Sequence, residues 1–139
     1  MWIEDELFEA IVEKMPIPTV DAIVVDGERF LLLKRNNPPV KGEWWLPRGR
    51  VRKGESLEEA VKREVLEETG LRVRVLRQVG VTNQVFPECH TISIYYLAEP
   101  ASLAVTLNSE HSGYRWVSRL PRGSHHYLKT MIEKAGLPS

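Results

Sequence analysis

The sequence predicts an α/β fold of the α+β kind, a sandwich in which helices interrupt a largely antiparallel set of strands. Apolar residues recur at helical spacing near both ends and in the middle of the chain, and runs rich in β-branched residues separate them. The 139 residues, 42% hydrophobic and 27% charged, are enough to bury one core. We therefore expect a single domain over residues 1–139.

The first half of the chain predicts one helix and then a hairpin. Apolar residues at helical spacing favour an amphipathic helix over residues 3–14, and the segment PIP ends it. The runs TVDAIVVD and RFLLLKR are β-rich, and Asp26-Gly27 between them favours a hairpin turn. NNPPVKGE is expected to be a loop, WWLP the start of a short strand, and RGRVRKGE a glycine-punctuated loop.

The second half begins with a helix from Ser56 to about Thr69. Ser56 and Glu59 form a capping box, and Gly70 suits the C-terminal end of this helix. Strands are expected in LRVRVLRQVG, TISIYYLAE and YRWVS. HHYLKTMIEKA predicts a closing helix, opened by the exposed residues His125 and His126.

Composition and charge exclude several classes of protein. The net charge is zero, with 19 basic and 19 acidic residues, which argues against a general binder of nucleic acids or membrane surfaces. No apolar run approaches the roughly 20 residues that span a bilayer. The lone cysteine, Cys89, cannot form an intramolecular disulfide, so a reducing compartment is expected. Because MWIEDELFEA is acidic where a signal peptide is basic, we expect a cytoplasmic protein with no nucleic-acid or membrane partner.

Three glutamates crowd the end of the middle helix, in the segment KREVLEETGL. At about 100° per residue, Glu67 and Glu68 lie within about 60° of Glu64. The apolar residues of the preceding turns share this direction: they are Leu57, Ala60 and Val61. A stripe that begins apolar, and should face the core, therefore continues as carboxylates.

Spacing alone leaves two interpretations of this carboxylate face. Glutamates on a helix usually form a solvated face, but here Glu58, Glu59 and Lys62 already supply the solvent side. Neighbouring carboxylates repel each other by a few tenths of a kcal/mol per pair, and burial raises that cost unless a cation lies among them. A hard divalent cation such as Mg²⁺ takes oxygen ligands of this kind, so metal binding is the alternative.

The segment GRVRKGESLEEAVKREVLEETGL carries a longer pattern. Its defined positions are Gly49, Glu55, Arg63, Glu64, Val65, Glu67, Glu68, Gly70 and Leu71. They resemble the Nudix box, G-x5-E-x7-R-E-U-x-E-E-x-G-U with U an aliphatic residue, at every defined position. The resemblance implies the Nudix α/β/α sandwich with a mixed sheet. It also implies hydrolysis of a nucleoside diphosphate linked to another moiety, with Mg²⁺ or Mn²⁺ as cofactor.

The resemblance implies roles for the residues of the box. The implied metal ligands are Glu64, Glu67 and Glu68, together with the backbone carbonyl of Arg48. Arg63 would orient and partly neutralise the glutamates, and Glu55 would be a supporting acid. Many members have Gly-Gly after the proline, where this chain has Pro47-Arg48-Gly49-Arg50. Any residue supplies a carbonyl, so metal binding should survive, and we expect the added Arg48 side chain to reach a substrate phosphate.

Flanking segments resemble a narrower branch, the GDP-mannose mannosyl hydrolases. The similar segments are IVEKMPIPTVDAIVV, FLLLKRNNPPVKGEWWLPRGRVRKGE and EHSGYRWV. This likeness implies that Arg35 and Arg50 contact the diphosphate, where the guanidinium fork matches phosphate oxygens. It also implies that Asp21 and Tyr114 lie by the site and that His111 is the general base.

Each of these residues has an alternative that the sequence leaves open. Arg35 could be a solubility residue of an edge strand, Asp21 a turn former at a strand end, and Tyr114 a core aromatic. His111 could be a surface residue of a polar loop. Four other aromatic residues could stack on a nucleobase or pack in the core: they are Trp44, Trp45, Phe86 and Tyr95.

The two resemblances imply different reactions. The complete box favours attack of water at phosphorus, with Glu110 as the base or an extra metal ligand. The mannosyl hydrolases carry an altered box and cleave at the sugar carbon, for which His111, with a pKa near neutrality, would be the base. A nucleotide-binding module without activity is a third alternative, which the retained glutamates disfavour. We expect a small-molecule nucleotide substrate, and the branch likeness implies a homodimer that uses the N-terminal helix.

Overall fold

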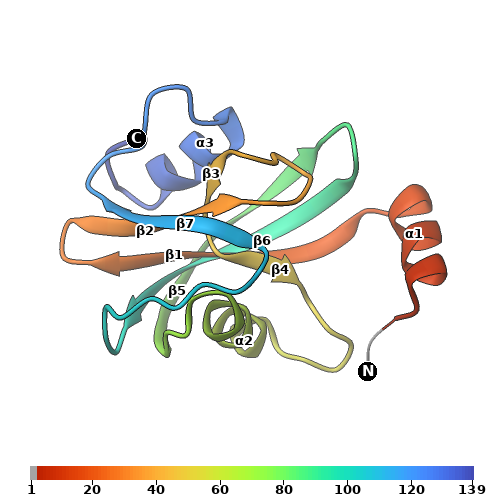
Figure 1. Cartoon of the computed structure of the whole chain (residues 1–139), viewed down its shortest axis with the longest axis horizontal. Coiled ribbons are helices and arrows are strands. Elements are labelled where there is room, and N and C mark those ends of the chain that lie inside the picture. Colours follow the sequence, from red (N-terminus) through yellow and green to blue (C-terminus); the bar gives the residue numbers. More distant parts are fainter. Residues whose placement is uncertain (1–2) are drawn as a thin grey trace.

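A seven-stranded mixed sheet forms the centre of the part of the chain that the computed structural model describes, residues 3–139 (Figure 1). Its strands are β1 (Ile17–Asp26), β2 (Arg29–Arg35), β3 (Trp44–Trp45), β4 (Arg48–Arg50), β5 (Val73–Val85), β6 (His90–Pro100) and β7 (His111–Val117). The helices are α1 (Asp5–Lys14), α2 (Leu57–Thr69) and α3 (His126–Lys134).

Strand β1 organises the sheet. It runs parallel to β6 and antiparallel to β2 and β4. β5 extends the sheet beyond β6, while β3 and β7 both pair with β2, and these three pairings are antiparallel. The combination of a parallel pair with antiparallel neighbours confirms the expected mixed sheet.

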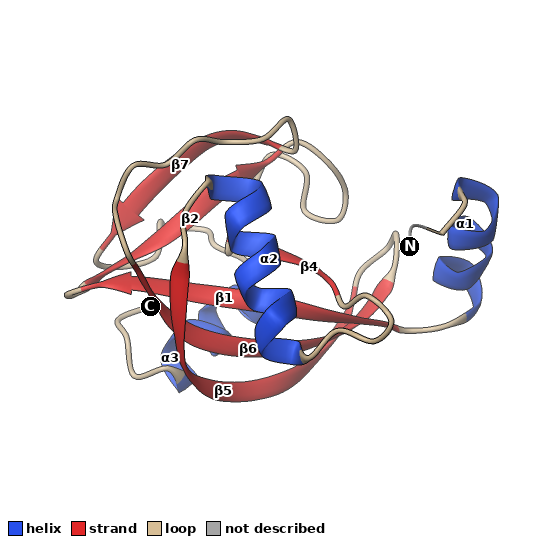
Figure 2. Cartoon of the chain, turned by 90° about the horizontal axis from the view of Figure 1, so that it is seen from below, coloured by secondary structure: helices blue, strands red, loops and turns tan. Residues whose placement is uncertain are grey.

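Helices cover both faces of this sheet. α2 packs on one face and α3 on the other (Figures 1 and 2). Val20, Val61 and Val65 belong to the core beneath α2, whereas Trp45 and Met131 belong to the core beneath α3. The expected α/β/α sandwich is therefore confirmed. α1 lies apart from both layers, beyond the end of β1 where the chain enters the sheet, and none of its residues is fully buried.

The predicted signals at the ends of α2 are confirmed. The Ser56 hydroxyl accepts a hydrogen bond from the Glu59 N–H at 3.1 Å, and Gly70 ends the helix with φ at 72°. At the hairpin between β1 and β2, Gly27 has φ at 61°, a left-handed conformation that a residue without Cβ adopts at little cost. No helix among residues 3–139 is both long and apolar enough to cross a membrane.

Some boundaries differ from the sequence prediction. The residues RGR were expected to begin a loop, but they form β4, because Thr19, Val20 and Asp21 of β1 supply pairing partners. β5 continues to Val85, well beyond the predicted strand, and β7 starts at His111. Long-range pairing made these segments extended, and local sequence carries little information about such pairing.

The aromatic residues left open by the sequence fall mainly in the core. Trp45 and Tyr95 are fully buried and Phe86 is nearly so, which agrees with core packing rather than stacking on a nucleobase. The expectation that His125 is exposed was wrong. Its ring is half-buried, lies 5.5 Å from the ring of Trp45, and accepts the Tyr127 N–H at the start of α3.

Candidate functional site

A pocket of about 440 Å³ opens beside the N-terminal end of β1 and is lined by residues of α1, β4 and α2, among others. Glu64 and Glu68 of α2 form its acidic wall, and Glu88 and Glu110 also line it. Three arginines line the same pocket and are called its basic wall: Arg35, Arg48 and Arg50. Apolar surface closes the remaining sides: Phe8 and Val12 of α1, Ile17, Pro38, Pro39 and Cys89.

The acidic wall is the inward face of α2. Glu64 and Glu68 continue the stripe of buried residues that starts at Ala60 and Val61. The Glu68 residue is 2% exposed and the Glu64 side chain 12%. Glu67 instead lies on the flank of this face, where its side chain is 45% exposed. Two of the three box glutamates therefore point inward.

Strand β4 presses its backbone against these two carboxylates. A Cβ atom on Gly49 would lie 2.1 Å from Cδ of Glu64, so only glycine leaves room for this carboxylate. One residue earlier, the Arg48 N–H donates a 3.0 Å hydrogen bond to Oε1 of Glu68. The Nudix-box glycine is thus required by the close approach of strand and helix, and not by an unusual φ angle.

Arg63 ties the loop before α2 to the acidic wall. Its guanidinium lies 2.6 Å from Oε2 of Glu55 and 2.5 Å from Oε1 of Glu64, and it donates to the Arg50 carbonyl at 3.0 Å. The Arg63 hydrogen bond is the main reason that the pKa of Glu55 lies below its ordinary value. Glu67 completes this set with a contact of 3.4 Å to Arg63.

Burial makes the two inward carboxylates hard to ionise. It raises the pKa of Glu64 to about 7, against the opposing effect of Arg63. Burial, followed by the charge of Glu64, also raises the pKa of Glu68 well above its ordinary value. A cation placed between the two would remove both penalties, since it favours the charged forms. This donor set therefore fits a hard divalent metal ion.

Arg48 forms a buried ion pair with Asp21. Asp21 faces Arg48 in the register of β1 and β4, with Arg48 Nε 3.6 Å from its carboxylate. The Trp45 indole and the Ser93 hydroxyl also donate to this carboxylate. Asp21 thus lies in the middle of β1, fully buried, so the alternative of a turn former at a strand end was wrong.

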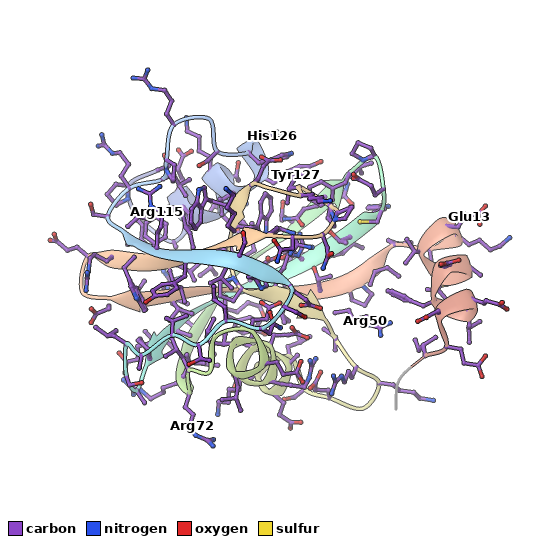
Figure 3. All side chains as sticks on the ribbon, viewed as in Figure 1. Glu13, Arg50, Arg72, Arg115, His126 and Tyr127 are labelled. Carbon is purple, nitrogen blue, oxygen red and sulfur yellow. The ribbon has the colours of Figure 1, made fainter. Side chains whose placement is uncertain are left out.

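The other two arginines are held at the rim. Arg35 Nε donates to the Pro39 carbonyl at 2.8 Å, and burial, followed by the nearby charge of Arg48, lowers its pKa. Arg50 reaches from β4 toward α1, where its guanidinium lies 4.0 Å from the ring centroid of Phe8 (Figure 3). This contact joins α1 to the pocket.

His111 and Glu110 lie where the chain enters β7. His111 is 5% exposed, so it is not a surface residue. Burial and the charge of Arg35 lower its pKa to about 4, so the expected pKa near neutrality was wrong. Tyr114, three residues further on, is 45% exposed and does not line the pocket, and is therefore not the core aromatic that the sequence left open.

The structure brings half of the twelve expected site residues together in the lining of the pocket. Six of them line the pocket: Arg35, Arg48, Arg50, Glu64, Glu68 and Glu110. Sequence reasoning missed Phe8 and Val12, because they read only as the apolar face of an amphipathic helix. It also missed Asn108, which contacts both His111 and the Glu110 backbone and has no motif around it.

Comparison with known proteins identifies the family. The Nudix domain model matches residues 15–120. A protein of Methanocaldococcus jannaschii named ADP-ribose pyrophosphatase is 43% identical over 86 residues, which are 60% of this chain and 51% of that protein. This chain therefore matches about half the length of that relative. It belongs to the Nudix family, which confirms the recognition from the box.

Solved structures agree with this assignment. A MutT protein from Methanosarcina mazei is 33% identical, with a TM-score of 0.78 over 87% of this chain and 94% of that one. The Nudix domain of Shewanella oneidensis NrtR, solved with ADP-ribose, is 25% identical, with a TM-score of 0.69 over 96% and 92% of the two chains. The narrower likeness to mannosyl hydrolases stays a prediction.

Proposed function

We propose that this chain is a divalent-metal-dependent hydrolase that cleaves a nucleoside diphosphate linked to another moiety, by attack of water at phosphorus. One observation carries the proposal: the inward face of α2 presents Glu64 and Glu68 to a pocket that three arginines also line. Carboxylates suit a metal ion and guanidiniums suit phosphate oxygens. A diphosphate with its metal needs both within one pocket.

In this proposal Glu64, Glu68 and the Arg48 carbonyl hold the metal. Glu67 joins them only if its carboxylate leaves the arginines with which it pairs, Arg52 and Arg63. Mg²⁺ or Mn²⁺, when bound, would screen the diphosphate charge, polarise its oxygens and lower the pKa of a bound water.

The remaining residues position these groups. Arg63 fixes Glu64 and is itself fixed by Glu55. Arg35 and Arg50 line the pocket and would contact phosphate oxygens, and Arg48 is more deeply buried and held by Asp21. Glu110 lines the same pocket and is the proposed base or extra metal ligand.

The pocket suits a substrate with a nucleobase or sugar beyond the diphosphate. Its volume of about 440 Å³ falls within the usual range for ligand sites of roughly 300–1,000 Å³. Phe8 and Val12 offer apolar surface on the α1 side. ADP-ribose is the substrate we test first, because one similar protein is named ADP-ribose pyrophosphatase and another was solved with ADP-ribose bound.

The alternative is a glycosyl hydrolase that attacks the sugar carbon with His111 as the base. The position of His111 beside Glu68 and Glu110, two residues that line the pocket, supports this alternative. The low pKa of His111 weighs against it, since a base with a pKa of about 4 accepts a proton poorly at neutral pH. The homodimer also remains a prediction, for which α1 with the residue that follows it offers the surface, since Leu7 is 56% and Met15 58% exposed.

A substrate screen tests the proposal. ADP-ribose, GDP-mannose and 8-oxo-dGTP are incubated with the protein and Mg²⁺ or Mn²⁺, and products are separated by mass. We expect turnover of a diphosphate-linked substrate that requires the metal and falls by about 100-fold or more in Glu68→Gln. Glu58→Gln, an exposed glutamate of the same helix, is the matched control and should keep full activity. Binding of these nucleotides without turnover would favour the non-catalytic module.

A further inference from the structure

A second set of metal donors includes Glu68 and two residues from outside the Nudix box. One oxygen of Glu68, one oxygen of Glu110 and one ring nitrogen of His111 all lie within 4.8 Å of one another. Donors on opposite sides of one ion, with bonds of about 2.1 Å, are about 4.2 Å apart. Small side-chain movements would therefore let all three bind the same ion.

His111 brings a nitrogen that has nothing else to bind. Its Nε2 atom is buried and has no hydrogen-bond partner among residues 3–139. Buried polar side-chain atoms are nearly always paired, so an unpaired one on a histidine that lies beside two carboxylates needs an explanation. A positively charged ion between them would satisfy the nitrogen and both oxygens together.

Asn108 sets the tautomer that leaves Nε2 free. Its Oδ1 accepts the Glu110 N–H at 3.1 Å and lies 3.2 Å from Nδ1 of His111. Because a backbone N–H only donates, the Asn108 atom at this point is the oxygen, so Nδ1 of His111 must carry the proton. The lone pair is then on Nε2. Metal-bound histidines are commonly held in this way, with the other ring nitrogen donating to an oxygen.

We propose that Glu68, Glu110 and His111 form a second metal site, which shares Glu68 with the Nudix-box site and prefers Mn²⁺ to Mg²⁺. Imidazole suits transition metals, whereas Mg²⁺ takes oxygen ligands and keeps much of its water. The proposal deepens the function given above and rests on it only for the expectation that this ion faces the diphosphate. Binding of the metal does not depend on turnover.

If His111 binds a metal ion, only one of the two candidate reactions remains possible in the form given above. A histidine whose Nε2 binds a metal ion has no lone pair left to accept a proton, since Nδ1 is protonated. His111 then cannot be the base for attack at the sugar carbon. Glu110 likewise becomes a ligand rather than the base.

Electron paramagnetic resonance of bound Mn²⁺ tests the site directly. Electron spin echo modulation detects a ¹⁴N nucleus bonded to Mn²⁺, and we expect this coupling in the wild-type protein. His111→Gln should abolish the coupling and weaken Mn²⁺ relative to Mg²⁺ by at least about tenfold. His126→Gln, which changes an exposed histidine at the start of α3, is the matched control and should leave both unchanged.

Labelling avoids dependence on a variant that fails to fold. Wild-type protein grown with ¹⁵N-histidine should show a ¹⁵N coupling in place of the ¹⁴N one. Asn108→Ala, which frees the His111 ring, should weaken Mn²⁺ binding by about 10–100-fold. Mn²⁺ that binds without nitrogen coupling in the wild type, or a coupling that survives His111→Gln, overturns the second site.

Turnover measured on the same samples distinguishes failure of the second metal site from failure of the proposed function. Hydrolysis of ADP-ribose or another screened nucleotide without nitrogen coupling overturns the second site and leaves the proposed function standing. Nitrogen coupling without turnover of any nucleotide supports the site and counts against the proposed function.

Discussion

Glu64 and Glu68 occupy positions of α2 where packing calls for apolar side chains. Each would be more stable as a neutral group, because the surroundings remove water from the carboxylate. Val65, between them, shows what the fold itself prefers at this face. The free-energy cost of two buried carboxylates therefore supports the proposed metal site.

This cost predicts how the stability of the metal-free protein depends on pH. The pKa of Glu64 is about 7 in the folded chain and its ordinary value is 4.5, so the folded state keeps a proton that the unfolded state has lost. The stabilising contribution is full below pH 4.5 and is lost as pH rises toward 7. At about 1.36 kcal/mol per pKa unit, we expect a loss on the order of 1–3 kcal/mol.

Urea unfolding in EDTA at pH 5 and pH 8 measures this loss. Glu64→Gln removes the titrating group, so this variant should be more stable than the wild type at pH 8 while losing metal-dependent activity. Glu58→Gln, on the exposed side of α2, should follow the wild type. A wild-type protein that gains stability from pH 5 to pH 8 would contradict the assigned cost.

Gly49 offers a second test at the residue scale. In Gly49→Ala the new methyl group would lie 2.1 Å from Glu64 Cδ and must displace that carboxylate. We expect folded protein whose affinity for Mn²⁺ falls by about tenfold or more, measured by calorimetric titration. In Gly113→Ala the added Cβ meets only Trp44, at 3.6 Å, so this control should bind the metal normally. Equal affinity in Gly49→Ala and the wild type would exclude Glu64 as a ligand.

At the scale of elements, α1 is the segment with the weakest packing. It has no fully buried residue, and its contact with the pocket runs through Phe8 and Arg50. We expect Phe8→Ala to raise KM for the nucleotide by about tenfold with little change in kcat, because the apolar wall contributes to binding rather than to chemistry. Amide hydrogen exchange in α1 should also become faster.

Leu7→Ala is the matched control for this element. Leu7 precedes Phe8 in the same helix but is 56% exposed, so its truncation should leave KM and hydrogen exchange nearly unchanged. If Phe8→Ala and Leu7→Ala behave alike, α1 takes no part in substrate binding.

Elements with strong local signals could be predicted from the sequence, and those that depend on partners could not. α2 was predicted with its ends because Ser56 and Gly70 act within a few residues of each other along the chain. β4 was not, because an arginine-rich RGR segment becomes a strand only when β1 pairs with it. The length of β5 could not be predicted for the same reason, because its pairing with β6 sets that length.

For the candidate site too, the sequence predicted the residues with local signals and missed those that depend on distant partners. The box glutamates followed from spacing within one helix, although only the fold shows that Glu67 lies to the side. The buried state of His111 was hidden, since a histidine in a polar segment carries no sign that Arg35 and β2 will cover it. Asn108 was missed for the same reason.

At the scale of the whole molecule, the pocket collects residues from distant parts of the chain. Phe8, Arg35, Arg48, Glu64 and Glu110 meet in one pocket although the net charge of the chain is zero. Both acidic and basic side chains line this pocket, which suits a substrate that is itself an anion paired with cations. The central claim is that this arrangement directs water to phosphorus.

Hydrolysis in water enriched with ¹⁸O tests that claim most directly. A nucleoside diphosphate sugar is turned over in single-turnover amounts with Mn²⁺, and both products are weighed by mass spectrometry. We predict that one ¹⁸O atom enters a phosphate, giving a nucleoside monophosphate and a sugar phosphate, with slower turnover in Glu110→Gln. A free sugar carrying the label, together with unlabelled nucleoside diphosphate and collapse of the rate in His111→Ala, would contradict attack at phosphorus.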